Sequence, residues 1–189
     1  MKLSEVELSK AYRLLNHGVT TMVSSKFNGV ENVMSAAWVG AMDFNKVSAV
    51  IGTQSYTRTL IEKSGYFAVQ VPVVAQAQLV LKMGEISRYN DENKLKNVEI
   101  FYQNGFDIPL VKGCVAYLIC KVIPEIHNQK TYDIFFGEVI SAWADERVFE
   151  NGRYKLDSVP KELRTLHYVA GGQFYTISDS LNFKSDMPE

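Results

Sequence analysis

Segments in which apolar residues dominate, many of them β-branched or aromatic, recur along the chain and end at turn signals. Such segments have the composition of β-strands, and polar stretches separate them. Asn28-Gly29 is a strong hairpin signal between the first two segments. The segments cover residues 19–25, 32–38, 47–52, 66–71, 115–122 and 134–144. The pattern therefore predicts about six strands.

Helical signals are fewer and shorter. Near the start, Ser4 and Glu7 have the spacing of a capping box, and Asn16-His17-Gly18 supplies a stop. Two further helices are predicted, one over 55–63 before Ser64-Gly65 and one over 73–83 before Gly84. Weaker signals predict single helical turns at 91–95, within a polar excursion over 85–106, and at 160–166.

This order of elements contains no strand–helix–strand units. It therefore favours a mainly β fold, a closed antiparallel barrel with peripheral helices, with a sandwich as the alternative. Gly137 lies inside the last strand and predicts either a bulge or a close backbone approach. Apolar residues make up 47% of the 189-residue chain, and no linker divides them, so we expect one domain over residues 1–189.

Charge and motifs exclude several classes of function. A net charge of −1 gives no basic excess for tracking nucleic-acid phosphates. No apolar run is long enough to span a membrane, and the first ten residues do not have the pattern of a signal peptide, so we expect a cytoplasmic protein. Cys114 and Cys120 predict neither a disulfide framework nor a zinc site, and the three histidines are scattered, so no metal site is predicted. The common nucleophile, metalloprotease and nucleotide motifs are absent.

Two segments carry candidate chemistry. Ser55-Tyr56-Thr57-Arg58 begins a predicted helix directly after a buried strand, where hydroxyls, a guanidinium and free N–H groups could hold a phosphate. A plain N-cap followed by an exposed arginine is the simpler interpretation. In Asn32–Trp38, small residues beside an aromatic would let a flat ring approach the backbone, although an ordinary half-buried strand with Trp38 in the core is the simpler interpretation.

Taken together and in order, these segments resemble the flavin reductase-like, or flavoredoxin-like, family of FMN-binding split-barrel proteins. The similarity covers most of the chain. It is carried by residues 11–15, 32–38, 55–61 and 64–67 in the first half, and by 136–139 and 166–172 in the second.

The resemblance implies a six-stranded antiparallel split barrel that forms a homodimer and holds FMN near the subunit interface. The ring would lie along one strand, and in this sequence the residues that match that strand are Asn32, Met34, Ser35, Ala36, Ala37 and Trp38. The phosphate would lie at the start of the next helix, and in this sequence the residues that match that segment are Thr53, Ser55, Thr57 and Arg58. Ser87 and Lys94 fall in a loop that flanks the flavin, although Arg88-Tyr89-Asn90 departs from the family's Gly-Arg-Asp.

The implied function is that of an FMN-dependent reductase, which takes a hydride from NADH or NADPH and passes electrons to an unknown second acceptor. Tyr132 stands where many relatives place a histidine facing the nicotinamide, and His167 lies in a segment that packs near the flavin, so both are candidate catalytic residues. The departure at Tyr132 also favours an alternative, a flavoredoxin-type electron carrier that does not oxidise nicotinamides. A B6-vitamer oxidase is a weaker alternative, because the arginine-rich signature of those enzymes is absent.

Overall fold

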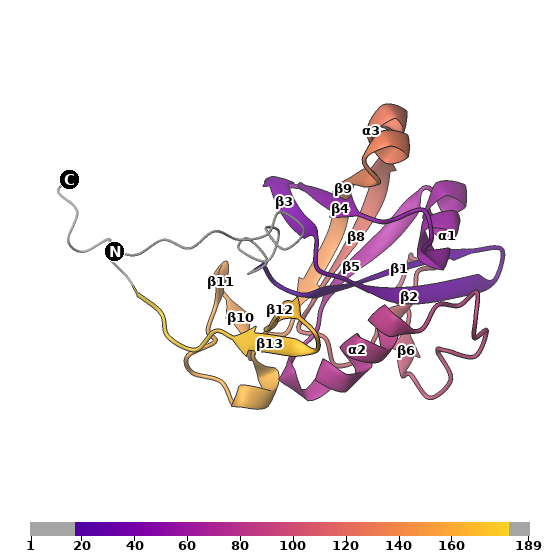
Figure 1. Ribbon diagram of the computed structural model, residues 1–189. Coiled ribbons are helices and arrows are strands. Elements are labelled where there is room, and N and C mark those ends of the chain that lie inside the picture. The colour runs from indigo at the N-terminus through magenta and orange to yellow at the C-terminus, as the bar shows by residue number, and fades with distance from the viewer. Residues whose placement is uncertain (1–17, 182–189) are drawn as a thin grey trace, which may run out of the picture.

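The computed structural model describes residues 18–181 (Figure 1). The predicted N-terminal helix and the family-like segment 11–15 therefore lie outside the described residues.

One antiparallel sheet dominates this part of the chain, and it has seven strands where six were predicted. The additional strand is β3, which lies in a stretch that the sequence pattern left as a connection. The strands run in the order β2-β1-β5-β8-β9-β4-β3. Their bounds are β1 Thr21–Phe27, β2 Val30–Ala36, β3 Val39–Asp43, β4 Lys46–Val50, β5 Tyr66–Val71, β8 Ala116–Ile123 and β9 Ile134–Ala144.

A short connection forces the sheet to curl. β2 and β3 stand at opposite ends of the strand order, yet only Ala37 and Trp38 separate them in sequence. The two edges must therefore come together at that point, and the N–H of Val50 in β4 donates to the carbonyl of Trp38 at 3.0 Å, which extends the β3–β4 pair into the connection. The result is a split barrel, whose edges meet at one end (Figure 1). The predicted fold class is confirmed.

Helices and small hairpins cover the sheet. α1 (Tyr56–Ser64) ends at Gly65 in the left-handed conformation, as the Ser-Gly signal predicted. The predicted second helix forms a 3-10 turn, η2 (Val74–Gln76), followed by α2 (Ala77–Glu85). The remaining elements are α3 (Ile126–Thr131), η3 (Lys161–Leu163) and the pairs β6 (Ile100–Phe101) with β7 (Leu110–Val111), β10 (Phe149–Glu150) with β11 (Arg153–Tyr154), and β12 (Leu166–Ala170) with β13 (Gln173–Thr176).

The barrel interior is packed tightly around Phe67, which is fully buried. A Cβ built on Gly137 would lie 2.5 Å from the ring of Phe67 and 2.9 Å from the Cβ of Cys120, so only glycine fits there. The close approach predicted at Gly137 is therefore present. The register shift of the β8–β9 pair lies elsewhere, between Ile119 and Cys120.

Two local interpretations are wrong, and a third is confirmed in part. Residues 91–95 form hydrogen-bonded turns rather than helix, because this stretch contains polar residues that favour local turns. The helical turn predicted over 160–166 covers only η3, and Leu166 already belongs to a hairpin. Trp38 is 54% exposed and so is not a core residue.

No helix in residues 18–181 combines the length and apolar character needed to cross a bilayer.

Candidate functional site

β2 is an edge strand, and two helices flank its open edge. Its other edge pairs with β1 over the full length of both strands. Thr57 and Asn32 join α1 to β2, while Ser35 joins β2 to α2. An unpaired strand edge presents backbone N–H and C=O groups that a ligand can use. Two adjoining hollows lie here, and we call them the polar hollow and the aromatic hollow.

The polar hollow has a volume of about 280 Å³ and lies between β2, the start of α1 and the loop after α2. Ser55 occupies the N-cap position of α1, but its side chain does not cap the helix and instead donates to Met34 Sδ at 2.9 Å. The first N–H groups of a helix have no partner within the helix and favour anions. The lining residues are Asn32, Met34, Ser35, Gln54, Ser55, Tyr56, Met83, Gly84, Glu85, Ile86, Ser87, Arg88 and Lys94.

Lys94 places a buried ammonium group in this hollow. The residue is 1% exposed, and Nζ makes one long hydrogen bond of 3.4 Å, to the carbonyl of Met83. Burial, together with the charges of Arg88 and Lys82, lowers the pKa of Lys94 to about 8. No acidic side chain of residues 18–181 forms an ion pair with it within 4 Å. A bound anion would compensate this charge.

Asn32 lines the same hollow as Lys94 and is also incompletely hydrogen-bonded. Its Nδ2 donates to Thr57 Oγ1 at 2.9 Å, so the buried Thr57 fixes the amide rather than facing the hollow. Its Oδ1 is buried and has no hydrogen-bond partner among the described residues. Such an atom loses its hydration without compensation unless a ligand donates to it.

Arg58 does not line either hollow. Its guanidinium donates to Glu62 and to Asp133, and also to the carbonyls of Ile51 at 3.0 Å and Gln129 at 2.7 Å. Four of its five N–H donors are therefore engaged by the protein. The residue is 5% exposed, so it is also not the exposed arginine of the simpler interpretation. Its contacts join α1 to α3 and to the start of β9, which gives Arg58 a structural role.

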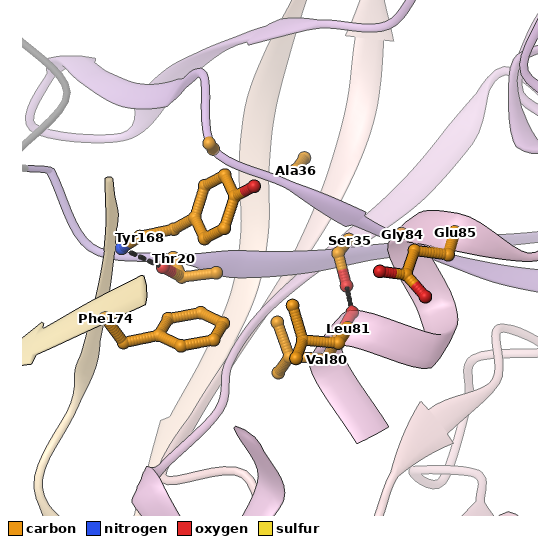
Figure 2. A pocket seen from close by; sticks show the side chains of 10 residues that line it. Thr20, Ser35, Ala36, Val80, Leu81, Gly84, Glu85, Tyr168 and Phe174 are labelled. Carbon is orange, nitrogen blue, oxygen red and sulfur yellow. Dashed lines mark hydrogen bonds between the residues drawn. The ribbon is translucent and has the colours of Figure 1, made fainter. Parts of the chain in front are cut away.

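The aromatic hollow continues along β2 and has a volume of about 250 Å³. The hairpin β12–β13 supplies Tyr168 and Phe174, whose ring centroids are 5.3 Å apart. In Figure 2 these rings face Val80 and Leu81 of α2 across the hollow. Thr20, Ser35, Ala36, Ala37, Gly84 and Glu85 complete the lining. A dry cavity of 150 Å³ can hold a benzene ring, so this space accommodates a larger flat ring.

Besides Thr57 and Arg58, four more of the predicted site residues lie outside both hollows. Thr53 and Trp38 are exposed. Tyr132 is 57% exposed at the end of α3, where its ring contacts His127. His167 is buried, with Nε2 3.1 Å from Thr165 Oγ1, and it neighbours Tyr168 on β12, so the two side chains point to opposite faces. Neither candidate catalytic residue therefore has a direct route to a ligand in the hollows.

Sequence reasoning missed several lining residues. Arg88 and Tyr56 contact each other at the rim, with the guanidinium carbon 5.6 Å from the ring centroid. Arg88 lies in the loop that departs from the family pattern, so the motif could not identify it. Phe174 belongs to no recognisable sequence motif, and nothing in the sequence showed that the β12–β13 hairpin returns to β2.

The described residues offer no reactive thiol. Burial raises the pKa of Cys114 and of Cys120 to about 12. Both are free and buried, so neither is a nucleophile or an accessible redox group. The arrangement is suited to binding an anion beside a flat ring rather than to acid, base or covalent catalysis.

Comparisons with known proteins agree with this geometry. The family model of the flavin reductase like domain matches residues 12–175. The chain belongs to the flavin reductase-like family. It is 38% identical to the uncharacterised protein YddH of Escherichia coli, over 90% of this chain and 93% of that protein.

Solved structures give the same result. An FMN-binding domain of a flavin reductases-like enzyme from Shewanella baltica has 52% identity and a TM-score of 0.86, with 94% of this chain and 95% of that chain covered. Flavoredoxin of Desulfovibrio vulgaris has 19% identity and a TM-score of 0.79, with 99% and 100% covered, and this likeness concerns the fold.

The buried charge of Lys94 predicts a pH-dependent stability. Below pH 8 the lysine is charged in both the folded and unfolded protein, so the full desolvation penalty opposes folding. Between about 8 and 10.5 the folded protein loses this proton first, and the penalty falls as pH rises. Lys94→Met should therefore raise the unfolding free energy of the ligand-free protein by about 1–3 kcal/mol at pH 7, with the gain disappearing toward pH 10.5. Urea unfolding across this range measures it.

The exposed neighbour Lys96 provides the matched control. Lys96→Met should change the unfolding free energy by less than about 0.5 kcal/mol at every pH. A Lys94→Met protein that is less stable than the wild type at pH 7 would contradict the account of Lys94 as an uncompensated buried charge.

Proposed function

We propose that this chain is an FMN-dependent oxidoreductase and that the two hollows together hold FMN. The observation that carries the proposal is the buried, uncompensated ammonium of Lys94 in a polar hollow that adjoins an aromatic one. FMN has the complementary structure, with an anionic phosphate at one end and a flat ring at the other. The likeness to the FMN-binding domain from Shewanella baltica supports this choice of ligand.

The residues divide according to the part of the cofactor that they would hold. Lys94, Arg88, Ser87 and the N–H groups at the start of α1 beside Ser55 suit the phosphate. Ala36 at the end of β2 and Ala37 directly after it suit the ring, because their small side chains leave the strand edge accessible, and Tyr168 and Phe174 form the opposite wall. Thr57 and Arg58 keep α1 and its neighbours in place.

The bound flavin would supply the redox chemistry, accepting a hydride or electrons at its ring. The protein then needs no nucleophile of its own, and neither cysteine nor histidine is among the residues that line the two hollows. Its part is to orient the ring along β2, to stabilise charge with preorganised N–H donors and to exclude water with the β12–β13 hairpin.

The phosphate assignment predicts a difference between two flavins. Lys94→Met should weaken FMN binding by about 1–3 kcal/mol, the range for a charge-assisted hydrogen bond left unmade. Riboflavin lacks the phosphate and should bind almost as before. Fluorescence titration of the flavin-free protein measures both affinities.

Arg58 provides the contrast. Since its guanidinium holds α1, α3 and β9 together, Arg58→Ala should weaken FMN and riboflavin to a similar extent. If Lys94→Met also weakened both flavins equally, the phosphate would not lie at Lys94.

For the electron donor we propose NADH or NADPH, with an unidentified second acceptor. The exposed position of Tyr132, directly after α3, favours the flavoredoxin-type carrier as the second candidate. Anaerobic mixing of the FMN-loaded protein with NADH or NADPH should bleach the flavin within seconds if the protein is a reductase. A flavin that stays yellow with both nucleotides but is bleached by dithionite would identify the carrier.

We also propose that the protein is a homodimer and that the exposed β3 edge contributes to its interface. Trp38, Met42 and Phe44 are 54%, 50% and 108% exposed on consecutive parts of this edge strand and its turn. Exposed apolar residues on an unpaired strand edge favour association. Light scattering should give a dimer for the wild type and for Ile126→Lys on α3, but a shift toward monomer for Phe44→Lys. A monomeric wild type that retains FMN would contradict the proposal.

A further inference from the structure

Glu85 is in an unfavourable position for a carboxylate. It is the last residue of α2, where the negative end of the helix dipole disfavours an acidic side chain. Lys82 and Arg88 each lie three residues away, yet Glu85 forms no hydrogen bond or ion pair with any described residue. Arg88 instead donates to the carbonyl of Glu92 at 3.0 Å. Local electrostatics therefore gives no reason for an acidic residue here.

Glu85 lies where the two hollows meet. Only Ser35, Gly84 and Glu85 line both of them. Ser35 Oγ is engaged, since it donates to the carbonyl of Val80 at 2.5 Å, and Gly84 has no side chain. Figure 2 shows the Glu85 carboxylate turned toward Ser35. This carboxylate is thus the uncommitted side-chain acceptor at the junction.

A second acceptor lines the polar hollow. Asn32 Oδ1 is buried in a residue that is 2% exposed, and it has no partner within residues 18–181. It comes from β2, whereas Glu85 comes from α2, so the two residues approach the hollow from different elements. A buried acceptor without a partner and an exposed carboxylate without a protein partner thus line one hollow, and together they suit a ligand with several donors.

We propose that Asn32 and Glu85 recognise a polyol chain, and specifically that they accept hydrogen bonds from the hydroxyls of the ribityl group. This inference rests on the proposed binding of FMN. The ribityl group joins the phosphate to the ring, so it would cross from the polar hollow to the aromatic one past Glu85. Hydroxyls donate strongly to carboxylates. The site would thereby select flavins with a polyol chain, independently of the phosphate contact at Lys94.

The test compares three ligands that differ in one part each. FMN has both phosphate and ribityl, riboflavin has the ribityl alone, and lumiflavin has neither. Their affinities for the flavin-free wild type, Glu85→Ala and the control Glu92→Ala are measured by fluorescence titration. Glu85→Ala should weaken FMN and riboflavin about tenfold each and leave lumiflavin unchanged. Glu92→Ala, from an exposed residue outside both hollows, should change none of them.

Other outcomes overturn the inference. Unchanged affinities in Glu85→Ala, or an equal loss for lumiflavin, would show that Glu85 does not contact a polyol. If Glu85→Ala bound FMN more tightly and riboflavin with unchanged affinity, Glu85 would only repel the phosphate. Because Glu85 is exposed, its variant should fold even if Asn32→Ala does not. If the wild type binds FMN and Lys94→Met binds it more weakly, the proposed function stands even when the inference about Glu85 fails. If the wild type binds no flavin, both the proposed function and this inference are wrong.

Discussion

The structure depends on the two-residue connection between β2 and β3. Because Ala37 and Trp38 join strands at opposite ends of a seven-stranded order, the sheet has to curl until its edges meet. The curl leaves the rest of the β2 edge unpaired, and α1 and α2 flank it. The polar hollow and the aromatic hollow are therefore a consequence of the way the barrel closes. Backbone groups, a helix start and the loop after α2 meet there because the topology brings them to one strand edge.

The polar hollow contains features that reduce stability. A buried lysine without an acidic partner and a buried amide oxygen without a donor both oppose folding of the ligand-free protein. The buried guanidinium of Arg58, by contrast, is paired through a network of hydrogen bonds, and Arg164 Nε is the other buried side-chain atom of residues 18–181 that has no hydrogen-bond partner. Uncompensated groups gathered at one place are typical of binding sites, where a ligand completes the missing interactions. The family's FMN-binding relatives and this local imbalance therefore support the same assignment.

Sequence patterns predicted the elements that local chemistry determines. Asn28-Gly29 gave the first hairpin, with positive φ at both residues, and Ser64-Gly65 gave the end of α1. β3 was missed because its residues are mostly exposed, so it lacks the burial pattern of a strand. The family resemblance pointed to Asn32, Ser55 and Lys94, and the structure brings all three together in the lining of the polar hollow. Arg58 could not be placed, because its partners Gln129 and Asp133 lie more than 70 residues away in sequence.

The central claim is that FMN lies along the β2 edge with its phosphate between the start of α1 and Lys94. A crystal structure of the protein with FMN tests it most directly. The account predicts flavin density spanning both hollows, with phosphate oxygens within hydrogen-bond distance of Lys94 Nζ and the ring beside Ala36 and Ala37. Density for the ring in the polar hollow, or for FMN away from the β2 edge, would contradict it.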